Sequence, residues 1–102
     1  MNARKVFGTL ALIAAFGSSP LALAYTGEEL APQAKVTLDK ARAIATKARH
    51  GQITDQELEK EKGGSGLRYS FDIKNGKVTC EVGVDAMTGK VLENKREGKN
   101  PD

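Results

Sequence analysis

The fold is decided by residues 67–84, LRYSFDIKNGKVTCEVGV. Apolar and polar side chains alternate strictly on both sides of Asn75-Gly76, which is the period of a half-buried strand. Asn-Gly is the preferred central pair of a two-residue type I′ turn, because both positions need a positive φ. We therefore predict an antiparallel hairpin whose two strands place their apolar residues on one shared face. These residues are Leu67, Tyr69, Phe71, Ile73, Val78, Cys80, Val82 and Val84.

Two further strands are predicted on either side of the hairpin. Residues 53–61 are mostly polar with two large apolar residues, which favours a strand at the edge of the sheet. The run Gly63-Gly64-Ser65-Gly66 joins this strand to the hairpin as a flexible turn. After the hairpin, Asp85-Ala86-Met87-Thr88-Gly89 forms a second turn, and a short last strand begins at Val91.

An amphipathic helix is predicted ahead of the strands. Thr37 is a good N-cap, and Lys47 and Arg49 lie in the last turn, where positive charge is favoured. Gly51 can end the helix in a left-handed conformation. Apolar residues recur at three- and four-residue intervals: Leu38, Ala41, Ile44, Ala45 and Ala48. The predicted fold class is therefore α+β, with one amphipathic helix packed on a four-stranded antiparallel meander sheet.

The first 24 residues have the pattern of a cleavable secretory signal. Arg4 and Lys5 precede an apolar run over residues 6–16, and Ala22-Leu23-Ala24 offers the small side chains that a signal peptidase requires. We place the cleavage between Ala24 and Tyr25. The apolar run is shorter than the ~20 residues that span a bilayer. We therefore expect an exported protein, periplasmic or extracellular, with no stable membrane anchor once the signal is removed.

The mature chain, residues 25–102, has the length of one domain with a small core. Cleavage lowers the Lys and Arg count from 16 to 14 against 13 Asp and Glu, so the mature net charge is only +1. Both signs are mixed along the chain, which argues against a nucleic-acid partner. We predict a lead-in at 25–36, the domain at 37–94 and a fraying polar tail at 95–102. Pro32 would interrupt a helix in the lead-in, so a turn or a mobile segment is expected there.

The sequence contains no combination of residues typical of catalysis. His50 is the only histidine and lies at the predicted helix end, where exposure or capping is the expected state. Cys80 is the only cysteine and alternates inward, where a thiol behaves as a small apolar residue and has no partner for an internal disulfide. If Cys80 were exposed instead, pairing between chains would be open. We predict no catalytic residue, no cofactor and no metal site.

Carboxylates occupy alternate positions of the first predicted strand and so share one face of it: Asp55, Glu57, Glu59 and Glu61. Solvation is the expected state of this face. Hard cations need six or more oxygens from a tightly turned loop, and the neighbouring Lys60 and Lys62 dilute the field. A small-ligand or cation-binding envelope protein is nevertheless the alternative that these carboxylates leave open.

Two segments resemble the PepSY domain family. They are LDKARAIA at residues 38–45 and VDAMTGKVL at residues 84–92, and the likeness spans about residues 35–93. The resemblance implies a helix on an antiparallel sheet, in agreement with the periodicity. Gln56 departs from the family's pattern, which has a small apolar residue on the first strand. The resemblance implies structural roles in packing and in the turn for Leu38, Ala41, Ala45, Tyr69, Asp85, Thr88 and Gly89.

PepSY domains occur in propeptides of secreted metallopeptidases, in envelope proteins and as lone exported domains. The resemblance therefore implies an exported, non-enzymatic binding module with a protein partner, a peptidase foremost. Contact is expected through the solvent face of the sheet or an exposed strand edge. The oligomeric state stays open.

Overall fold

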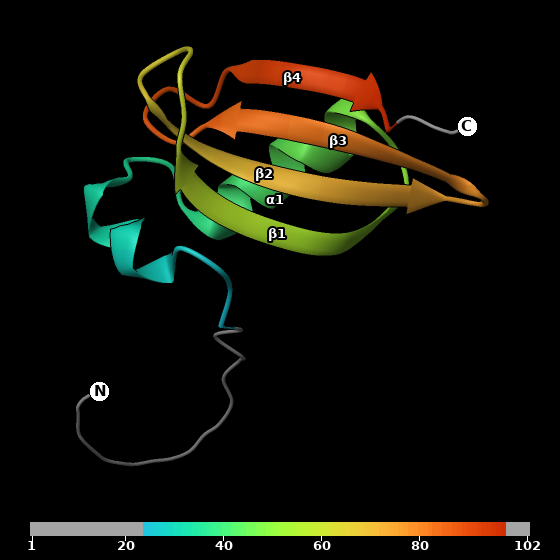
Figure 1. The fold of residues 1–102 in the computed structure, drawn as a ribbon, viewed down its shortest axis with the longest axis horizontal. Coiled ribbons are helices and arrows are strands. Elements are labelled where there is room, and N and C mark those ends of the chain that lie inside the picture. Colours follow the sequence, from blue (N-terminus) through green and yellow to red (C-terminus); the bar gives the residue numbers. More distant parts are fainter. Residues whose placement is uncertain (1–23, 98–102) are drawn as a thin grey trace.

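The computed structural model describes residues 24–97, in which one helix packs on one side of a single sheet (Figure 1). The strands are antiparallel and lie in the order β1-β2-β3-β4, so the predicted α+β meander is confirmed. Apart from Ala24, the predicted signal lies outside the described residues. The elements are η1 (Glu28–Gln33), α1 (Leu38–Ala48), β1 (Gln52–Lys60), β2 (Leu67–Asn75), β3 (Val78–Asp85) and β4 (Val91–Arg96).

Helix α1 begins where the sequence predicts but ends earlier, at Ala48, since Arg49 is its extended C-cap and Gly51 lies two residues further on. The Thr37 side chain accepts a hydrogen bond from the Lys40 N–H at 3.1 Å, which satisfies one free donor of the first turn. Ala41 and Ala45 are fully buried, and their small side chains let the helix lie close against the sheet. Gly51 has a φ of 147°, and a Cβ there would lie 2.7 Å from a carbonyl oxygen of β2. The chain therefore turns into β1 through a position that only glycine fits.

Tyr69 lies at the centre of the core. Its hydroxyl donates a hydrogen bond to the Val36 carbonyl oxygen at 2.7 Å, which gives the buried phenol its partner. Its ring stacks on Phe71 with 6.3 Å between the centroids. Cys80 is buried on β3, as predicted. The core cluster comprises Val36, Ala41, Ala45, Leu58, Leu67, Tyr69, Phe71, Ile73, Val82, Val84 and Ala86.

The turn of the central hairpin lies one residue later than predicted. Asn75 pairs with Val78 and ends β2, so the two central residues are Gly76 and Lys77. Gly76 has a φ of 65° and supplies the positive φ that a two-residue hairpin needs at its first central position. Relative to the predicted turn, the strands slip by two residues. Because two is the side-chain period of a strand, the shared apolar face is preserved.

A β-bulge at Thr54 explains the irregular pattern of β1. Ile53 pairs with β2 in one register, and the register shifts before Asp55. An extra residue reverses the alternation, so Ile53 and Leu58, five positions apart, both face the helix side. The same shift turns Gln56 toward α1, where its side-chain oxygen accepts a hydrogen bond from Arg42. The residue that departs from the family's pattern is therefore accommodated by a polar partner on the helix.

The lead-in differs from the predicted turn or mobile segment. Residues 28–33 form the 3-10 helix η1 with Pro32 inside it. A 3-10 helix tolerates this proline because only one short-range bond is lost with the missing N–H. Just before η1, the Thr26 carbonyl oxygen accepts a hydrogen bond from Leu58 N–H at 2.9 Å. A Cβ on Gly27 would lie 1.7 Å from the Leu58 carbonyl oxygen, so glycine is required for this close approach.

The polar tail begins later than predicted. Lys95 pairs with Glu81 and Arg96 with Cys80, so both residues belong to β4. The Glu97 N–H donates to the Thr79 carbonyl oxygen at 2.9 Å, which continues the ladder. Main-chain pairing with β3 holds this stretch in place although its side chains are charged.

Asp85 connects the β1–β2 loop to the β3–β4 turn. Its buried carboxylate accepts hydrogen bonds from the Ser65 N–H and hydroxyl, both at 2.7 Å, and from the N–H groups of Met87 at 2.8 Å and Thr88 at 3.2 Å. Burial alone would raise the pKa of Asp85, but these hydrogen bonds outweigh it and lower the pKa to about 2. Gly89 has a φ of 82° and donates its N–H to the Asp85 carbonyl oxygen at 2.8 Å.

We predict that Asp85→Ala lowers the free energy of unfolding by about 2–4 kcal/mol, because several charge-assisted hydrogen bonds are lost together. The folded pKa of Asp85 lies below its unfolded value. Its contribution is therefore present at neutral pH and lost as the pH falls from about 4 toward about 2. Urea unfolding between pH 7 and pH 2 measures both effects. The control is Asp55→Ala, which removes an exposed carboxylate. An equal loss in both variants would contradict the role of Asp85.

Candidate functional site

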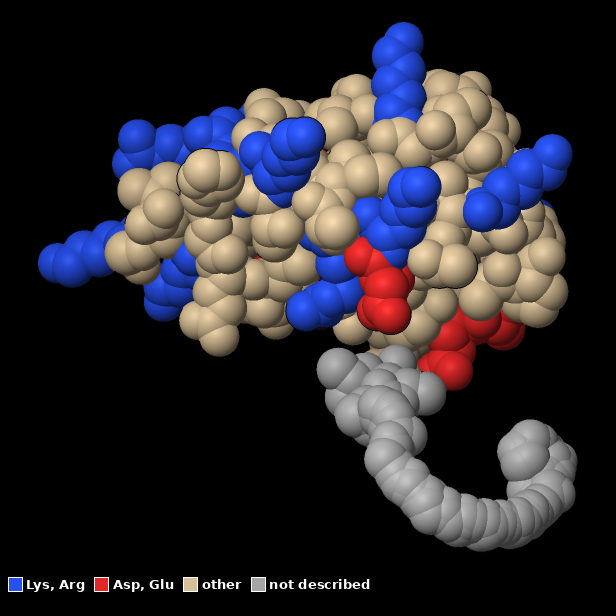
Figure 2. Space-filling model, turned by 180° about the vertical axis from the view of Figure 1, so that it is seen from behind, with Lys and Arg blue, Asp and Glu red and all other residues tan. Residues whose placement is uncertain are grey.

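The face of the sheet turned away from α1 is rich in carboxylates, and we call these residues the acidic face. They alternate outward along all four strands and just after β4. The cations that alternate onto the same face are Arg68, Lys74 and Lys95. On the opposite side, where α1 lies, the charged residues in view are mostly Lys and Arg (Figure 2). The acidic face consists of Asp55, Glu57, Glu59, Asp72, Glu81, Glu93 and Glu97.

The strand register places like charges directly opposite each other. Asp72 on β2 lies between Asp55 on β1 and Glu81 on β3. Like charges in such cross-strand positions destabilise a sheet. Burial, and then the surrounding carboxylates Glu59, Asp55, Asp72 and Glu61, raise the pKa of Glu57 above its usual range.

The pKa values of two more carboxyl groups of the acidic face are also raised. Burial, followed by the charges of Glu93 and Asp72, raises the pKa of Glu81. A side-chain hydrogen bond with Asp72, followed by its charge, raises the pKa of Glu97. The crowding of negative charge therefore extends from β1 to the end of β4.

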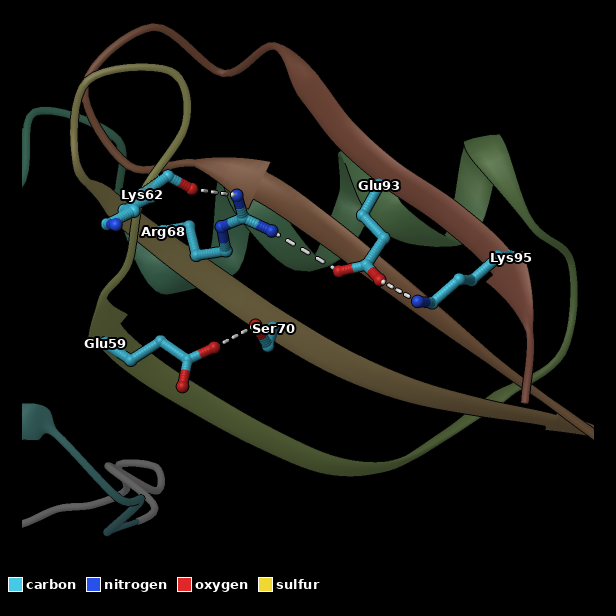
Figure 3. Close-up of polar contacts among 6 residues, drawn as sticks. All are labelled: Glu59, Lys62, Arg68, Ser70, Glu93 and Lys95. Carbon is cyan, nitrogen blue, oxygen red and sulfur yellow. Dashed lines mark hydrogen bonds and ion pairs between the residues drawn. The ribbon is translucent and has the colours of Figure 1, made fainter. Parts of the chain in front are cut away.

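Arg68 is the buried cation of this face (Figure 3). Its guanidinium reaches from β2 across β3 and contacts Glu93 on β4 at 3.3 Å. It also donates to the Lys62 carbonyl oxygen at 3.0 Å, while its Nε has no hydrogen-bond partner among the described residues. Glu93 in turn contacts Lys95 at 3.0 Å.

Gly83 makes the path of Arg68 possible. A Cβ at Gly83 would lie 3.2 Å from the Arg68 guanidinium and 3.3 Å from the Glu93 Cβ. Without a side chain at this position, the arginine can lie flat over β3. Beside it, the Ser70 hydroxyl donates to the Glu59 carboxylate at 2.6 Å and joins β2 to β1 (Figure 3).

The residues considered for chemistry from the sequence lie apart from this face. His50 is exposed between α1 and β1, and its carbonyl oxygen accepts from the Asn75 side chain at 3.3 Å. Cys80 is buried on the helix side of β3. Among residues 24–97, no three His, Cys, Asp or Glu side chains gather as a metal site. The same residues include no helix long and apolar enough to cross a membrane.

The motif residues lie mainly in the core and at the loop end of the sheet. Leu38 packs against the core, beside the buried Ala41 and Ala45. The Thr88 hydroxyl accepts from the Lys90 N–H at 3.2 Å within the turn held by Asp85. Sequence reasoning identified the carboxylates of β1 but missed those of the other strands. The alternating polar positions of residues 68–72 and 79–83 carried that signal, but only the register joins them to β1.

We predict that Arg68 and Glu93 are coupled by about 1–3 kcal/mol in a double-mutant cycle of Arg68→Met and Glu93→Gln, because removing Glu93 leaves the buried guanidinium of Arg68 without its carboxylate. The matched control is the cycle of Lys95→Met with Glu93→Gln. Its cation is 65% exposed, so its coupling is expected to be about 0.5 kcal/mol or less. Chemical unfolding measures both cycles. Equal coupling energies would show that the burial of Arg68 does not strengthen its ion pair with Glu93.

We predict that Glu57→Gln raises the melting temperature at pH 7, because it removes a charge from a crowded set. The folded pKa of Glu57, Glu81 and Glu97 is raised, so the folded state binds protons more tightly than the unfolded chain. Stability should therefore rise as the pH falls from 7 toward about 4.5. Circular dichroism melts at pH 7 and pH 5 measure this, and Glu29→Gln on η1 is the control. A lower melting temperature for Glu57→Gln would show that the charge of Glu57 does not destabilise the folded protein.

The helix and sheet that carry the acidic face match a known protein family. The family model described as PepSY, peptidase propeptide and YPEB domain, matches residues 35–95. The matched range contains α1 and all four strands except the last residue of β4. Searches among curated proteins and among solved structures found no match. The matched range covers more than half of the chain and coincides with the helix and sheet described above, and the chain therefore belongs to the PepSY family.

Proposed function

We propose that the chain is an exported, non-catalytic binding module that contacts and restrains a peptidase in the cell envelope or outside the cell. The single observation that carries this proposal is the match of residues 35–95 to a peptidase propeptide domain. Modules of this type generally act by binding rather than by catalysis. The leader pattern of residues 1–24 supports export.

We propose that the acidic face is the surface that contacts the peptidase. Directly opposed like charges cost stability and could be relieved by a basic surface of a partner. Complementary charge also speeds association and excludes wrong partners. The proposed partner is therefore a peptidase with a basic surface near its substrate cleft, and the Arg68–Glu93 pair would hold the opposing strands at a fixed spacing.

We expect the processed protein, recovered after export, to slow proteolysis by one of the secreted peptidases of its host and to co-purify with it. Glu57→Lys should weaken inhibition at least tenfold, because it reverses a charge within the acidic face. Glu29→Lys is the matched control, since it makes the same charge change on η1. Residual peptidase activity at increasing protein concentration measures the effect.

Three results would count against the proposal. The first is that no host peptidase is inhibited or co-purified. The second is an equal effect of Glu57→Lys and Glu29→Lys, which would remove the acidic face as the contact surface. The third is cleavage of the protein as an ordinary substrate at an undiminished rate.

A further inference from the structure

The two edges of the sheet differ in how they are protected. Both edge strands carry a β-bulge, at Thr54 in β1 and at Leu92 in β4, but the outer edge of β1 is also partly covered by Thr26, which pairs with it. Within residues 24–97, no segment pairs with the outer edge of β4. Val91, at the start of β4, is 37% exposed and is the most exposed large apolar side chain in that range. β4 is therefore the edge open to another strand.

The main-chain groups of β4 that face outward can be assigned from its pairing with β3. The Glu97 N–H donates to the Thr79 carbonyl oxygen of β3. Along an antiparallel strand this direction repeats every two residues, so Lys95 and Glu93 also point their N–H and C=O groups toward β3. The intervening residues, Asn94 and Arg96, direct theirs away from the sheet. The edge thus offers unpaired donors and acceptors centred on Asn94.

The sequence around Asn94 is complementary to itself when two copies run antiparallel. Glu93 precedes Asn94 and Lys95 follows it. If Asn94 lies opposite Asn94 of a second copy, each Glu93 lies opposite Lys95 of the other copy. These pairs are the non-hydrogen-bonded ones, in which opposed side chains approach most closely. Centring the pair on Arg96 instead would also oppose Lys95 to Glu97, but it would place the two Arg96 residues opposite each other.

We infer that a second copy of this chain pairs with β4 in an antiparallel register centred on Asn94, forming one continuous sheet across both copies. Asn94 of each copy exchanges main-chain hydrogen bonds with Asn94 of the other, and the regular pairing runs from Glu93 to Lys95, because Leu92 is the extra residue of a β-bulge against β3. Glu93 and Lys95 project from the outer face of the sheet and form charge pairs across the two-fold axis.

The side chain of Asn94 does not obstruct this pairing. Arg49 donates to its side-chain oxygen at 2.9 Å, and its amide group donates to the Ala48 carbonyl oxygen at 3.4 Å, so it is held at the end of α1. A single strand pair buries little area, so we expect the dimer to be weak and to form only at high protein concentration. The pairing leaves the acidic face open on both copies, and it stands independently of the proposed peptidase partner.

The test is sedimentation velocity of the processed protein from about 1 μM to 1 mM, where we expect a reversible monomer–dimer equilibrium. Lys95→Glu places a second carboxylate opposite Glu93 of the other copy and should weaken the dimer about tenfold or more. Lys77→Glu is the matched control, because it makes the same charge change at the hairpin tip and should leave the dimer unchanged. Circular dichroism checks that each variant is folded.

The register is tested by mixing Lys95→Glu with Glu93→Lys, each of which opposes like charges in its own dimer. In the mixture, the two carboxylates of the first variant lie opposite the two ammonium groups of the second. A heterodimer should therefore form at concentrations where each variant alone is monomeric. If Glu93→Lys does not fold, the comparison of Lys95→Glu with Lys77→Glu still decides. A wild-type monomer at 1 mM, or equal dimerisation of these two variants, would overturn the inference.

Discussion

Every register in this sheet is constrained by the need to keep the apolar residues of β2 against α1. Tyr69, Phe71 and Ile73 are almost completely buried, and the alternate residues Arg68 and Asp72 carry charges. A slip of one residue would bring those charges into the core, at a cost far larger than any single contact on the surface. The residues of the outer face do not determine the register. Their charges lie wherever the core places them, including the opposed carboxylates.

The features predicted from the sequence are those with a strong local period. The alternation of residues 67–84 and the spacing of Ala41 and Ala45 each identify one element and its buried face. The bulge at Thr54 was missed because one extra residue breaks the period without a turn residue to mark it. The ordered lead-in was missed for a different reason. Its conformation depends on the contacts of Thr26 and Gly27 with Leu58, which lies about 30 residues later in the sequence.

The acidic face shows the limit of reading one strand at a time. Asp55, Glu57 and Glu59 were visible as an alternating set, whereas Asp72, Glu81 and Glu93 join them only through the register. The position of Arg68 could not be read from the sequence either, because it depends on Gly83 of the next strand. The acidic face is therefore a property of the assembled sheet, and the family match does not identify it.

The meander order of the strands has a consequence for how the chain folds. Each strand pairs with the one next to it in sequence, so every loop that must close is short. Short loops cost little entropy before their contacts form, and proteins rich in local contacts fold quickly. A chain that crosses a membrane unfolded would emerge with its N-terminal part first. Such a chain can build this sheet one hairpin at a time, which shortens the period in which its apolar strands are exposed to aggregation.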